Sequence, residues 1–301
     1  MLRIGHVDLG TTHPAKFIEV ERTLGYEPIG VFDDFRIYDE AKAKAFAEAN
    51  KVKFYRSLDE LAGDVDVAFI HSVNWDQHIG KLMPFVERGK GVYIDKPVCG
   101  NLSDINKIKS LVRGGAIITG GSMIIFSDTV RSINDSQKSV APNIHLAMAG
   151  GPSDVYYYGA HVYYMLASVM GYDFSRVRYL GASSQKMYDI EWQSGKKAVI
   201  SIGDTTQKYF PFHMTLVSDA GATHFSIKGF EALKNMLTEV IPFIAGKGGK
   251  VPPVDSLLNC EIAALAGLKS ETSPGKFVAL SEVDESVKYD GAHYERIYGK
   301  K

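Results

Sequence analysis

LRIGHVDLGTTH, residues 2–13, decides the fold of the first half of the chain. Residues 2–8 are mostly apolar and predict a buried strand, and Pro14 stands near the start of a helix predicted over residues 15–24. Gly10 lies in the short turn between them. A strand, a tight glycine turn and a helix in this order predict the first unit of a parallel sheet with crossover helices.

The same alternation of strand and helix continues to about residue 119. Further strands are predicted over residues 26–32, 65–72, 91–94 and 116–119, and helices over residues 37–50, 75–88 and 103–113, the last capped by Ser103. A capping box at residues 57–60 predicts one more short helical turn. Strands that alternate with helices at this spacing form a mostly parallel sheet with right-handed crossovers. We therefore expect a doubly wound, Rossmann-type α/β domain over residues 1–122, with its ligand beyond the carboxyl ends of the strands.

The second half of the chain predicts a different architecture. Strands are predicted over residues 177–180, 188–193, 198–202, 213–218 and 223–227, and helices over residues 159–170, 231–244 and 255–269. The polar segment 129–142 is interpreted as a loop or a broken helix. Together these patterns predict an α+β domain with a largely antiparallel open sheet over residues 123–281. Residues 282–301 are interpreted as a C-terminal tail.

Composition excludes several classes of function. The chain has 301 residues with 34 basic and 35 acidic side chains, so nothing favours nucleic acid or an anionic membrane as partner. No apolar run is long enough to span a membrane, and a strand at the very start leaves no room for a signal peptide. Two distant cysteines, Cys99 and Cys260, indicate a cytoplasmic setting without disulfides. Histidines and acids show no metal-ligand spacing, so we expect no metal.

The first turn is a degenerate form of the dinucleotide fingerprint G-x-G-x-x-G. Asp8 and His13 occupy the outer glycine positions, and only the middle glycine is kept, as Gly10. A glycine there lets the backbone approach a pyrophosphate, the helix start offers free N–H groups, and Thr11 and Thr12 add hydroxyl donors. The alternative is a plain strand-to-helix turn in which Thr12 caps the helix.

Asp33 strengthens the case for a dinucleotide. It ends the second predicted strand, where a carboxylate accepts hydrogen bonds from the ribose hydroxyls of NAD and repels the 2′-phosphate of NADP. Arg36 lies close enough in sequence to leave NADP possible, and the alternative for Asp33 is a loop acid. Ser72 ends another strand and Asn74 follows it, so both are expected to border the same crevice.

The segment from His78 to Pro97 carries a resemblance to a known family. Its sequence Gly89-Lys90-Gly91-Val92-Tyr93-Ile94-Asp95-Lys96-Pro97 resembles the Gfo/Idh/MocA oxidoreductases, which include glucose–fructose oxidoreductase and inositol dehydrogenase. Members of that family have a histidine that opens a helix, then Gly-Lys-x-Val and Glu-Lys-Pro. The spacing of His78 and Lys96 agrees with theirs. The resemblance continues at residues 57–61, 159–161 and 255–270.

The resemblance implies roles for several residues. Lys96 matches the lysine that contacts the reacting hydroxyl and the nicotinamide, Pro97 a proline that often follows a cis bond, and His161 a catalytic acid/base histidine. Asp33 and Gly10 match the ribose-binding acid and the middle glycine. His78 is interpreted as orienting the cofactor or capping its helix. The family also implies a homodimer or homotetramer.

Departures from the family pattern concern mainly the groups around His161. Tyr157 stands where the family has an aspartate, and Tyr164 replaces a later acid. Tyr157 could relay a proton to or from His161, although a tyrosine cluster is more often packing or a sugar-stacking wall. Asp95 replaces the usual glutamate.

These observations predict an NAD(P)-dependent enzyme. It would transfer a hydride between the nicotinamide and a secondary hydroxyl of a sugar, sugar acid or cyclitol, with Lys96, His161 and Tyr157 as catalytic residues. Two alternatives are a redox-neutral enzyme that uses bound NAD for glycoside cleavage or epimerisation, and a non-catalytic regulator that binds dinucleotide or sugar. The expected cofactor is NAD, and the expected partner is a small polyol or sugar.

Overall fold

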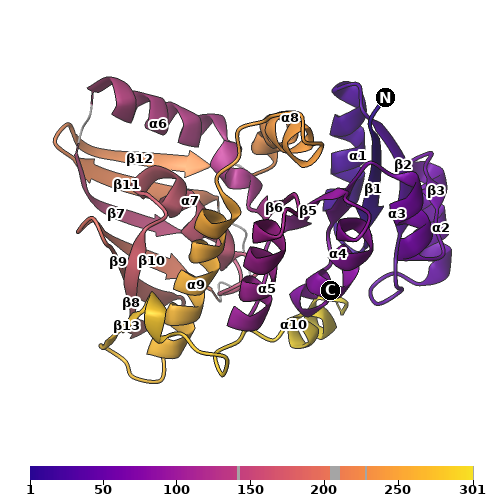
Figure 1. Ribbon diagram of the computed structural model, residues 1–301. Coiled ribbons are helices and arrows are strands. Elements are labelled where there is room, and N and C mark those ends of the chain that lie inside the picture. Colours follow the sequence, from indigo (N-terminus) through magenta and orange to yellow (C-terminus); the bar gives the residue numbers. More distant parts are fainter. Residues whose placement is uncertain (141–142, 204–210, 228, 301) are drawn as a thin grey trace. The chain divides into compact units, whose positions relative to one another are not determined.

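The computed structural model describes residues 1–140, 143–203, 211–227 and 229–300. These residues form two compact units (Figure 1). The first unit comprises Met1–Gly121, Lys234–Val254 and Asp290–Lys301, and the second comprises Ser122–Leu233 and Asp255–Tyr289. In the described part of the chain, no helix has the length and apolar character needed to cross a membrane.

The first unit contains a six-stranded sheet in the order β3-β2-β1-β4-β5-β6. Its strands are β1 (Arg3–Val7), β2 (Glu27–Phe32), β3 (Lys53–Phe54), β4 (Val67–Ile70), β5 (Gly91–Asp95) and β6 (Ile118–Gly121). All neighbouring pairs are parallel. This order is that of the doubly wound dinucleotide-binding fold. The predicted Rossmann-type sheet is confirmed; only β3, a strand of two residues, has no predicted counterpart.

Helices follow the strands as the alternation predicts. They are α1 (His13–Thr23), α2 (Glu40–Ala49), α3 (Leu58–Asp64), α4 (His78–Val86) and α5 (Leu102–Arg113), with a 3-10 turn η1 (Trp75–Gln77) before α4. Ser57 caps α3 by accepting a hydrogen bond from the Glu60 N–H at 3.2 Å. The predicted cap of α5 is wrong. Asn101, not Ser103, accepts from the Asp104 N–H at 2.9 Å, because α5 begins one residue before Ser103.

Two segments from late in the sequence pack with the first unit. One contains α8 (Leu233–Ile244), preceded by a 3-10 turn η3 (Gly229–Ala232). A Cβ atom at Gly91 would lie 1.8 Å from the Ile244 carbonyl oxygen, so the absence of a side chain there lets α8 approach β5. The other contains α10 (Gly291–Tyr298), within the predicted tail. The predicted boundaries, by contrast, divide the chain into consecutive segments.

The second unit contains a seven-stranded sheet in the order β12-β11-β7-β10-β9-β8-β13. The strands are β7 (Ile144–Gly150), β8 (Phe174–Ala182), β9 (Lys186–Trp192), β10 (Lys197–Ile202), β11 (Phe212–Ser218), β12 (Gly221–Ile227) and β13 (Phe277–Ala279). β7 and β10 pair in parallel and the other neighbours are antiparallel. The prediction of a largely antiparallel sheet is confirmed, although β7 and β13 lie in segments without a predicted strand.

Segment 129–142 begins as a regular helix rather than a loop. Helix α6 (Asp128–Val140) starts after Ser127, whose hydroxyl accepts from the Val130 N–H at 3.2 Å. Pro142 lies outside the described residues. A short 3-10 turn η2 (Met123–Phe126) precedes α6, and another, η4 (Leu280–Glu282), follows β13.

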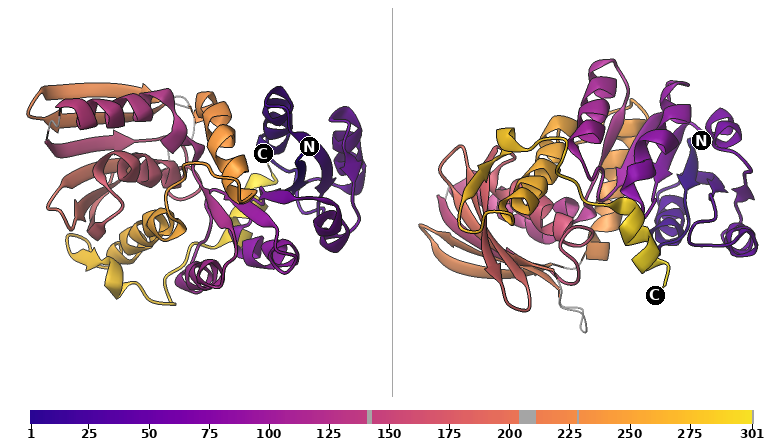
Figure 2. Two further views of the ribbon diagram at one scale, coloured as in Figure 1. Left: turned by 45° about the horizontal axis from the view of Figure 1, so that its top comes forward. Right: turned by 90° about the horizontal axis from the view of Figure 1, so that it is seen from below.

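Two helices, α7 (Gly159–Met170) and α9 (Val254–Ser270), cover one face of the second sheet (Figure 2). The Tyr164 hydroxyl on α7 donates to Glu261 on α9 at 3.1 Å, which joins the two helices. Met148 and Met187 alternate along their strands with buried neighbours and are 48% and 38% exposed. Their side chains therefore point to the face opposite the helices.

Candidate active site

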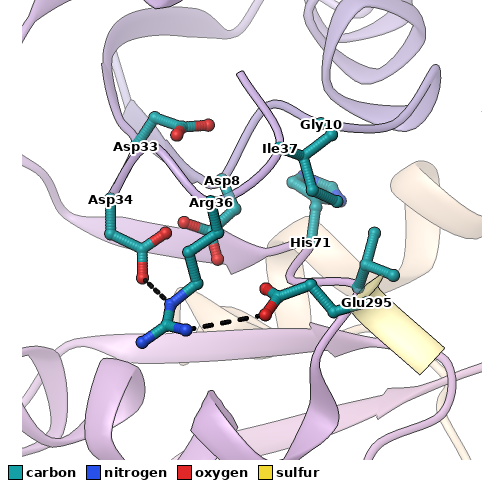
Figure 3. Close-up of a pocket in the computed structure, with 9 residues that line it drawn as sticks. Asp8, Gly10, Asp33, Asp34, Arg36, Ile37, His71 and Glu295 are labelled. Carbon is teal, nitrogen blue, oxygen red and sulfur yellow. Dashed lines mark hydrogen bonds and ion pairs between the residues drawn. The ribbon is translucent and has the colours of Figure 1, made fainter. Parts of the chain in front are cut away.

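The carboxyl ends of the first sheet border a pocket, as the fold predicts (Figure 3). Its lining residues are Asp8, Gly10, Asp33, Asp34, Arg36, Ile37, His71, Val73 and Glu295. Three of them, Asp8, Gly10 and Asp33, are predicted cofactor-binding residues. Glu295 comes from the C-terminal helix α10, and nothing in the sequence pattern connects that helix with this pocket.

Asp8 occupies the position of the first fingerprint glycine and adopts a left-handed backbone conformation with φ of 64°. Aspartate tolerates that conformation better than most residues. Its Oδ2 atom accepts hydrogen bonds from the Ser72 hydroxyl and the Lys81 ammonium, and Lys81 also contacts Asp34 at 2.9 Å. Oδ1 of Asp8 is buried and has no hydrogen-bond partner among the described residues. An acceptor therefore remains available for a donor from a ligand.

Gly10 is needed because Ile37 packs against it. A Cβ atom at this position would lie 2.7 Å from the Ile37 Cβ. The Thr11 hydroxyl accepts from the His13 N–H at 3.2 Å, while Thr12 at the N-cap of α1 makes no side-chain capping bond. Thr12 is thus the N-cap by position only. The His13 N–H is taken by Thr11 and Pro14 has no N–H, so the donors that would suit an anion here are those of the loop before α1 and of Ala15.

Asp33 is held in place by two backbone groups. Its carboxylate accepts from the Leu9 N–H at 2.8 Å and the Phe35 N–H at 2.7 Å. Burial raises the pKa of Asp33 to about 6, although these two hydrogen bonds act in the opposite direction. The carboxylate therefore ties the first loop to the end of β2 and presents an acid at the position where a dinucleotide ribose binds.

Asp95, at the end of β5, anchors a buried chain of imidazoles. His13 Nδ1 donates to its Oδ2 atom at 2.5 Å, and His71 Nδ1 contacts the same atom at 3.1 Å. His71 Nε2 lies 3.1 Å from His6 Nδ1, and His6 Nε2 lies 3.1 Å from Glu21 Oε2. The network joins residues at the ends of three strands, β1, β4 and β5, to both ends of α1, so no local sequence pattern marks His6 and His71 as its members.

The hydrogen positions in this network follow from its charges. Burial would raise the pKa of Asp95, but His13 and His71 outweigh it, and the pKa lies well below its ordinary value. Burial lowers the pKa of His71 to about 4, so a neutral His71 donates from Nδ1 to Asp95 and accepts at Nε2 from His6 Nδ1–H.

The same network bears on the expectation of no metal. Single ligand atoms of His13, His71 and Asp95 lie within 4.8 Å of one another, which is close enough for three ligands of one cation. Each of these atoms already has a hydrogen-bond partner in the network. The absence of a metal stays a prediction.

Lys96 follows Asp95 directly in the sequence. It is buried, its backbone N–H donates to Asp95 Oδ1 at 2.8 Å, and the Lys96–Pro97 bond is cis, as the resemblance implies. His78 bridges two loops near this strand end: its ring nitrogens lie 2.9 Å from the Val98 carbonyl and 3.1 Å from the Ser72 carbonyl. Burial lowers the pKa of His78. In the structure, His78 therefore positions the loops that follow β4 and β5.

Asn74 links the pocket rim to the C-terminal helix. Its side-chain oxygen accepts from the Asp76 N–H at 3.1 Å and caps η1, and its amide donates to Glu295 at 3.4 Å. Both polar atoms of the Asn74 side chain thus contact protein groups, one in η1 and the other in α10.

His161 and Tyr157 belong to the second unit. The Nδ1 atom of His161 is hydrogen-bonded to the Ser122 hydroxyl at 2.5 Å, and the ring packs on Phe212 with centroids 4.8 Å apart. The ring of Tyr158 lies 6.5 Å from that of His161, and Tyr157 packs edge-on against Tyr158. Ser122 was not predicted, since no spacing rule joins it to a histidine 39 residues later.

The residues present fit a dinucleotide at its ribose and phosphate ends. Asp33 offers carboxylate acceptors, Asp8 has an acceptor without a partner, and the start of α1 offers N–H donors. Lys81 offsets the negative charge that Asp8 brings to the first fingerprint position. The sequence did not single out Lys81; the available signal was a lysine one turn into the helix that follows β4.

Comparisons with known proteins agree with this geometry. Residues 4–118 match the model of an oxidoreductase family with an NAD-binding Rossmann fold, Gfo/Idh/MocA. No curated protein sequence matches the chain significantly.

Solved structures show the same fold over almost the whole chain. Scyllo-inositol dehydrogenase from Lactobacillus casei is 14% identical with a TM-score of 0.79 over 93% of this chain and 98% of its own. Myo-inositol dehydrogenase from Lactobacillus casei, in complex with NAD(H) and myo-inositol, is 13% identical with a TM-score of 0.79 over 93% and 96%. An NAD-binding oxidoreductase from Klebsiella pneumoniae is 14% identical with a TM-score of 0.75 over 93% and 98%.

The family match covers the six-stranded sheet except Arg3 in β1 and the last three residues of β6, and with it every pocket residue but Glu295. The resemblance noted at residues 78–97 is confirmed by this match. Residues 4–118 thus match the NAD-binding Rossmann fold of the Gfo/Idh/MocA oxidoreductase family.

Proposed function

We propose that this protein is an NAD-dependent dehydrogenase that oxidises a secondary hydroxyl of a small polyol, sugar or sugar acid. The observation that carries the proposal is the pocket at the carboxyl ends of β1, β2 and β4, where Asp33 and the uncapped start of α1 are placed together. Bound NAD would supply the hydride acceptor. Asp33, Asp8 and the backbone N–H groups of residues 10–12 would hold it.

Lys96 is the proposed charge-stabilising residue. Removal of a hydride from a secondary alcohol requires loss of the hydroxyl proton, and a nearby ammonium stabilises the alkoxide that develops. The side chain is buried, with 4% of its surface exposed, so its charge acts in a medium of low dielectric. The Asp95 carboxylate holds the backbone of Lys96 in place through the 2.8 Å hydrogen bond.

His161 is the proposed acid/base residue. An imidazole exchanges protons near neutral pH, and the Ser122 hydroxyl at its Nδ1 atom fixes the ring orientation. Tyr157, at the position of the family's aspartate, is the proposed partner in proton transfer. Its ring contacts Tyr158, which in turn contacts His161.

The polyol substrate class rests on the solved structures. The two inositol dehydrogenases share this fold, and one was crystallised with NAD(H) and myo-inositol. Those names describe the neighbours. They support a small polyhydroxylated ring or chain as substrate for this protein.

A panel of cyclitols, sugars and sugar acids, monitored by the absorbance of reduced nicotinamide, tests the proposal. We expect turnover of at least one polyol by the wild type and a loss of about 100-fold or more in Lys96→Ala. Lys90→Ala is the matched control, because Lys90 precedes the opposite end of the same strand. Equal turnover by wild type and Lys96→Ala would remove Lys96 from its role, and cofactor binding without any turnover would favour a regulator.

We further infer that the protein works in the cytoplasm as a homodimer or homotetramer. Both cysteines are buried thiols, which suits a reducing compartment. The uncovered face of the second sheet carries the exposed Met148, Met187 and Leu180 side chains, and half-apolar sheet faces need a cover. A second copy of the chain is the proposed cover.

A further inference from the structure

The C-terminal helix α10 is docked on the first unit beside the pocket, through four kinds of contact. Asp76 accepts hydrogen bonds from the first backbone N–H groups of the helix, those of Gly291 at 3.0 Å and Ala292 at 3.2 Å. The rings of Trp75 and Tyr294 lie 5.5 Å apart. A Cβ at Gly291 would lie 2.5 Å from the Asn74 side-chain oxygen, so the close approach requires glycine there.

The fourth contact brings Glu295 into the pocket. Its carboxylate lies 3.5 Å from the Arg36 guanidinium and accepts from the Asn74 amide at 3.4 Å. On its other side, Arg36 donates to Asp34 at 3.0 Å (Figure 3). Arg36 is therefore held between two carboxylates, one from the loop after β2 and one from α10.

Arg36 is also the one residue of this pocket that suits a 2′-phosphate. It lies three residues after Asp33, in the loop that in this fold faces the adenosine ribose. A guanidinium binds phosphate through paired N–H donors, and a phosphate monoester carries a charge of about −1.5 to −2 at neutral pH. Arg36 is already paired with Asp34 and Glu295. An incoming phosphate would therefore meet more negative than positive side chains: the carboxylates are Asp8, Asp33, Asp34 and Glu295, and the cations are Lys81 and Arg36.

We propose that Glu295 is a specificity-determining residue, which makes the pocket select NAD over NADP by occupying Arg36 and adding a carboxylate beside the ribose site. The inference rests on the proposed binding of a dinucleotide. It gives the C-terminal helix α10 a role in the choice between NAD and NADP. That choice then does not depend on residues 4–118 alone.

Glu295→Gln is the direct test. The amide keeps the shape of the side chain and its oxygen can still accept from Asn74, so the docking of α10 is retained, while the charge on Arg36 is released. Dissociation constants for NADH and NADPH are measured by titration with nicotinamide fluorescence as the readout. We expect the ratio of the NADPH to the NADH constant to fall about tenfold, since a charge-assisted hydrogen bond to phosphate becomes available.

Two further variants make the result specific. Glu87→Gln removes an exposed acid after α4, at the other end of that helix from His78, and should leave the ratio unchanged. In the double variant Arg36→Gln/Glu295→Gln the ratio should return to the wild-type value or above, because the phosphate partner is gone. Should Glu295→Gln fail to fold, as judged by circular dichroism, Glu295→Ala removes the same carboxylate and is expected to show the same shift.

An unchanged ratio in Glu295→Gln would overturn the inference, as would a shift that persists without Arg36 or appears equally in Glu87→Gln. If the wild type binds neither NADH nor NADPH, the proposed function itself fails and this inference with it. Binding of NADH with an unaltered ratio defeats only the role of Glu295.

Discussion

Asp95 connects the strand end that carries Lys96 to a buried network that reaches Glu21. Its carboxylate accepts from His13 and His71 and from the backbone N–H of Lys96. The family pattern places glutamate at this position. Aspartate is one methylene shorter, and here the two imidazoles lie close enough to contact it. Asp95 and the histidines at positions 13 and 71 are therefore parts of one local arrangement.

Asp95→Asn should destabilise the fold, because the buried His71 and the partly buried His13 lose the carboxylate that compensates their N–H dipoles. We expect a loss of about 3 kcal/mol in the free energy of unfolding, measured by urea denaturation. Asp59→Asn is the control: Asp59 is 71% exposed in its ion pair with Arg88, so its loss should cost about 0.5 kcal/mol or less. Equal losses in the two variants would contradict the structural role of the network.

Asp33 predicts a pH dependence of cofactor binding. Its pKa in the folded chain is about 6, and only the ionised form is a full acceptor for ribose hydroxyls. Affinity for NAD should therefore fall by up to about tenfold per unit as the pH drops below about 6. Titrations between pH 5 and 8 on the wild type and on Asp33→Asn, which should lack this dependence, check the assignment.

Through Asp33, the stability of the fold depends on pH in the opposite direction from cofactor binding. A carboxyl whose pKa is higher in the folded than in the unfolded chain binds its proton more tightly when folded. Its contribution to stability is therefore fully present in acid, below its unfolded pKa, and is lost as the pH rises through about 6. The ionised form of Asp33, which we propose binds the ribose, thus comes at some cost in stability.

Among the elements, α10 has the role that was hardest to foresee. The strands and helices of the first unit follow from apolar runs, caps and glycines, which are local signals. The docking of α10 depends on contacts between residues 74–76 and 290–295, more than two hundred positions apart. Local patterns showed the segment only as a polar tail. Lys81 and Ser122 were missed for the same reason, since their partners are distant in sequence.

Gly291→Ala should release α10, since the added Cβ would lie 2.5 Å from the Asn74 side chain and 3.0 Å from the Trp75 nitrogen. We expect faster amide hydrogen exchange over residues 291–298, measured by mass spectrometry. Gly299→Ala is the matched control at the other end of the helix, where φ is −67° and a Cβ comes no closer than 3.4 Å to the nearest atom. Unchanged protection in Gly291→Ala would show that the close approach is not required.

At the scale of the whole molecule, the two sheets follow the predicted fold class, while the chain crosses between the units more often than predicted. Helix α8 was expected in the second domain because it follows the antiparallel strands directly. Its packing is decided by Gly91 in β5, which gives the Ile244 backbone room to approach. A periodic pattern shows that a helix has an apolar face, and it carries no information on which sheet covers that face.

The exposed face of the second sheet predicts self-association. Analytical ultracentrifugation should show a multiple of the 33.1 kDa chain mass. Met148→Glu places a charge among the exposed apolar side chains and should shift the population toward the monomer. The comparison is Glu87→Lys, which changes the charge at an exposed position of the first unit. A monomeric wild type, or equal behaviour of both variants, would contradict the proposed interface.

The central claim is that the carboxyl edge of the first sheet binds NAD through Asp33, and calorimetric titration of NAD into the purified protein tests it most directly. We predict saturable binding of one NAD per chain with a dissociation constant below about 1 mM, and binding at least about tenfold weaker in Asp33→Asn at pH 7.5. Absence of binding to the wild type, or equal affinity in the wild type and Asp33→Asn, would contradict the account.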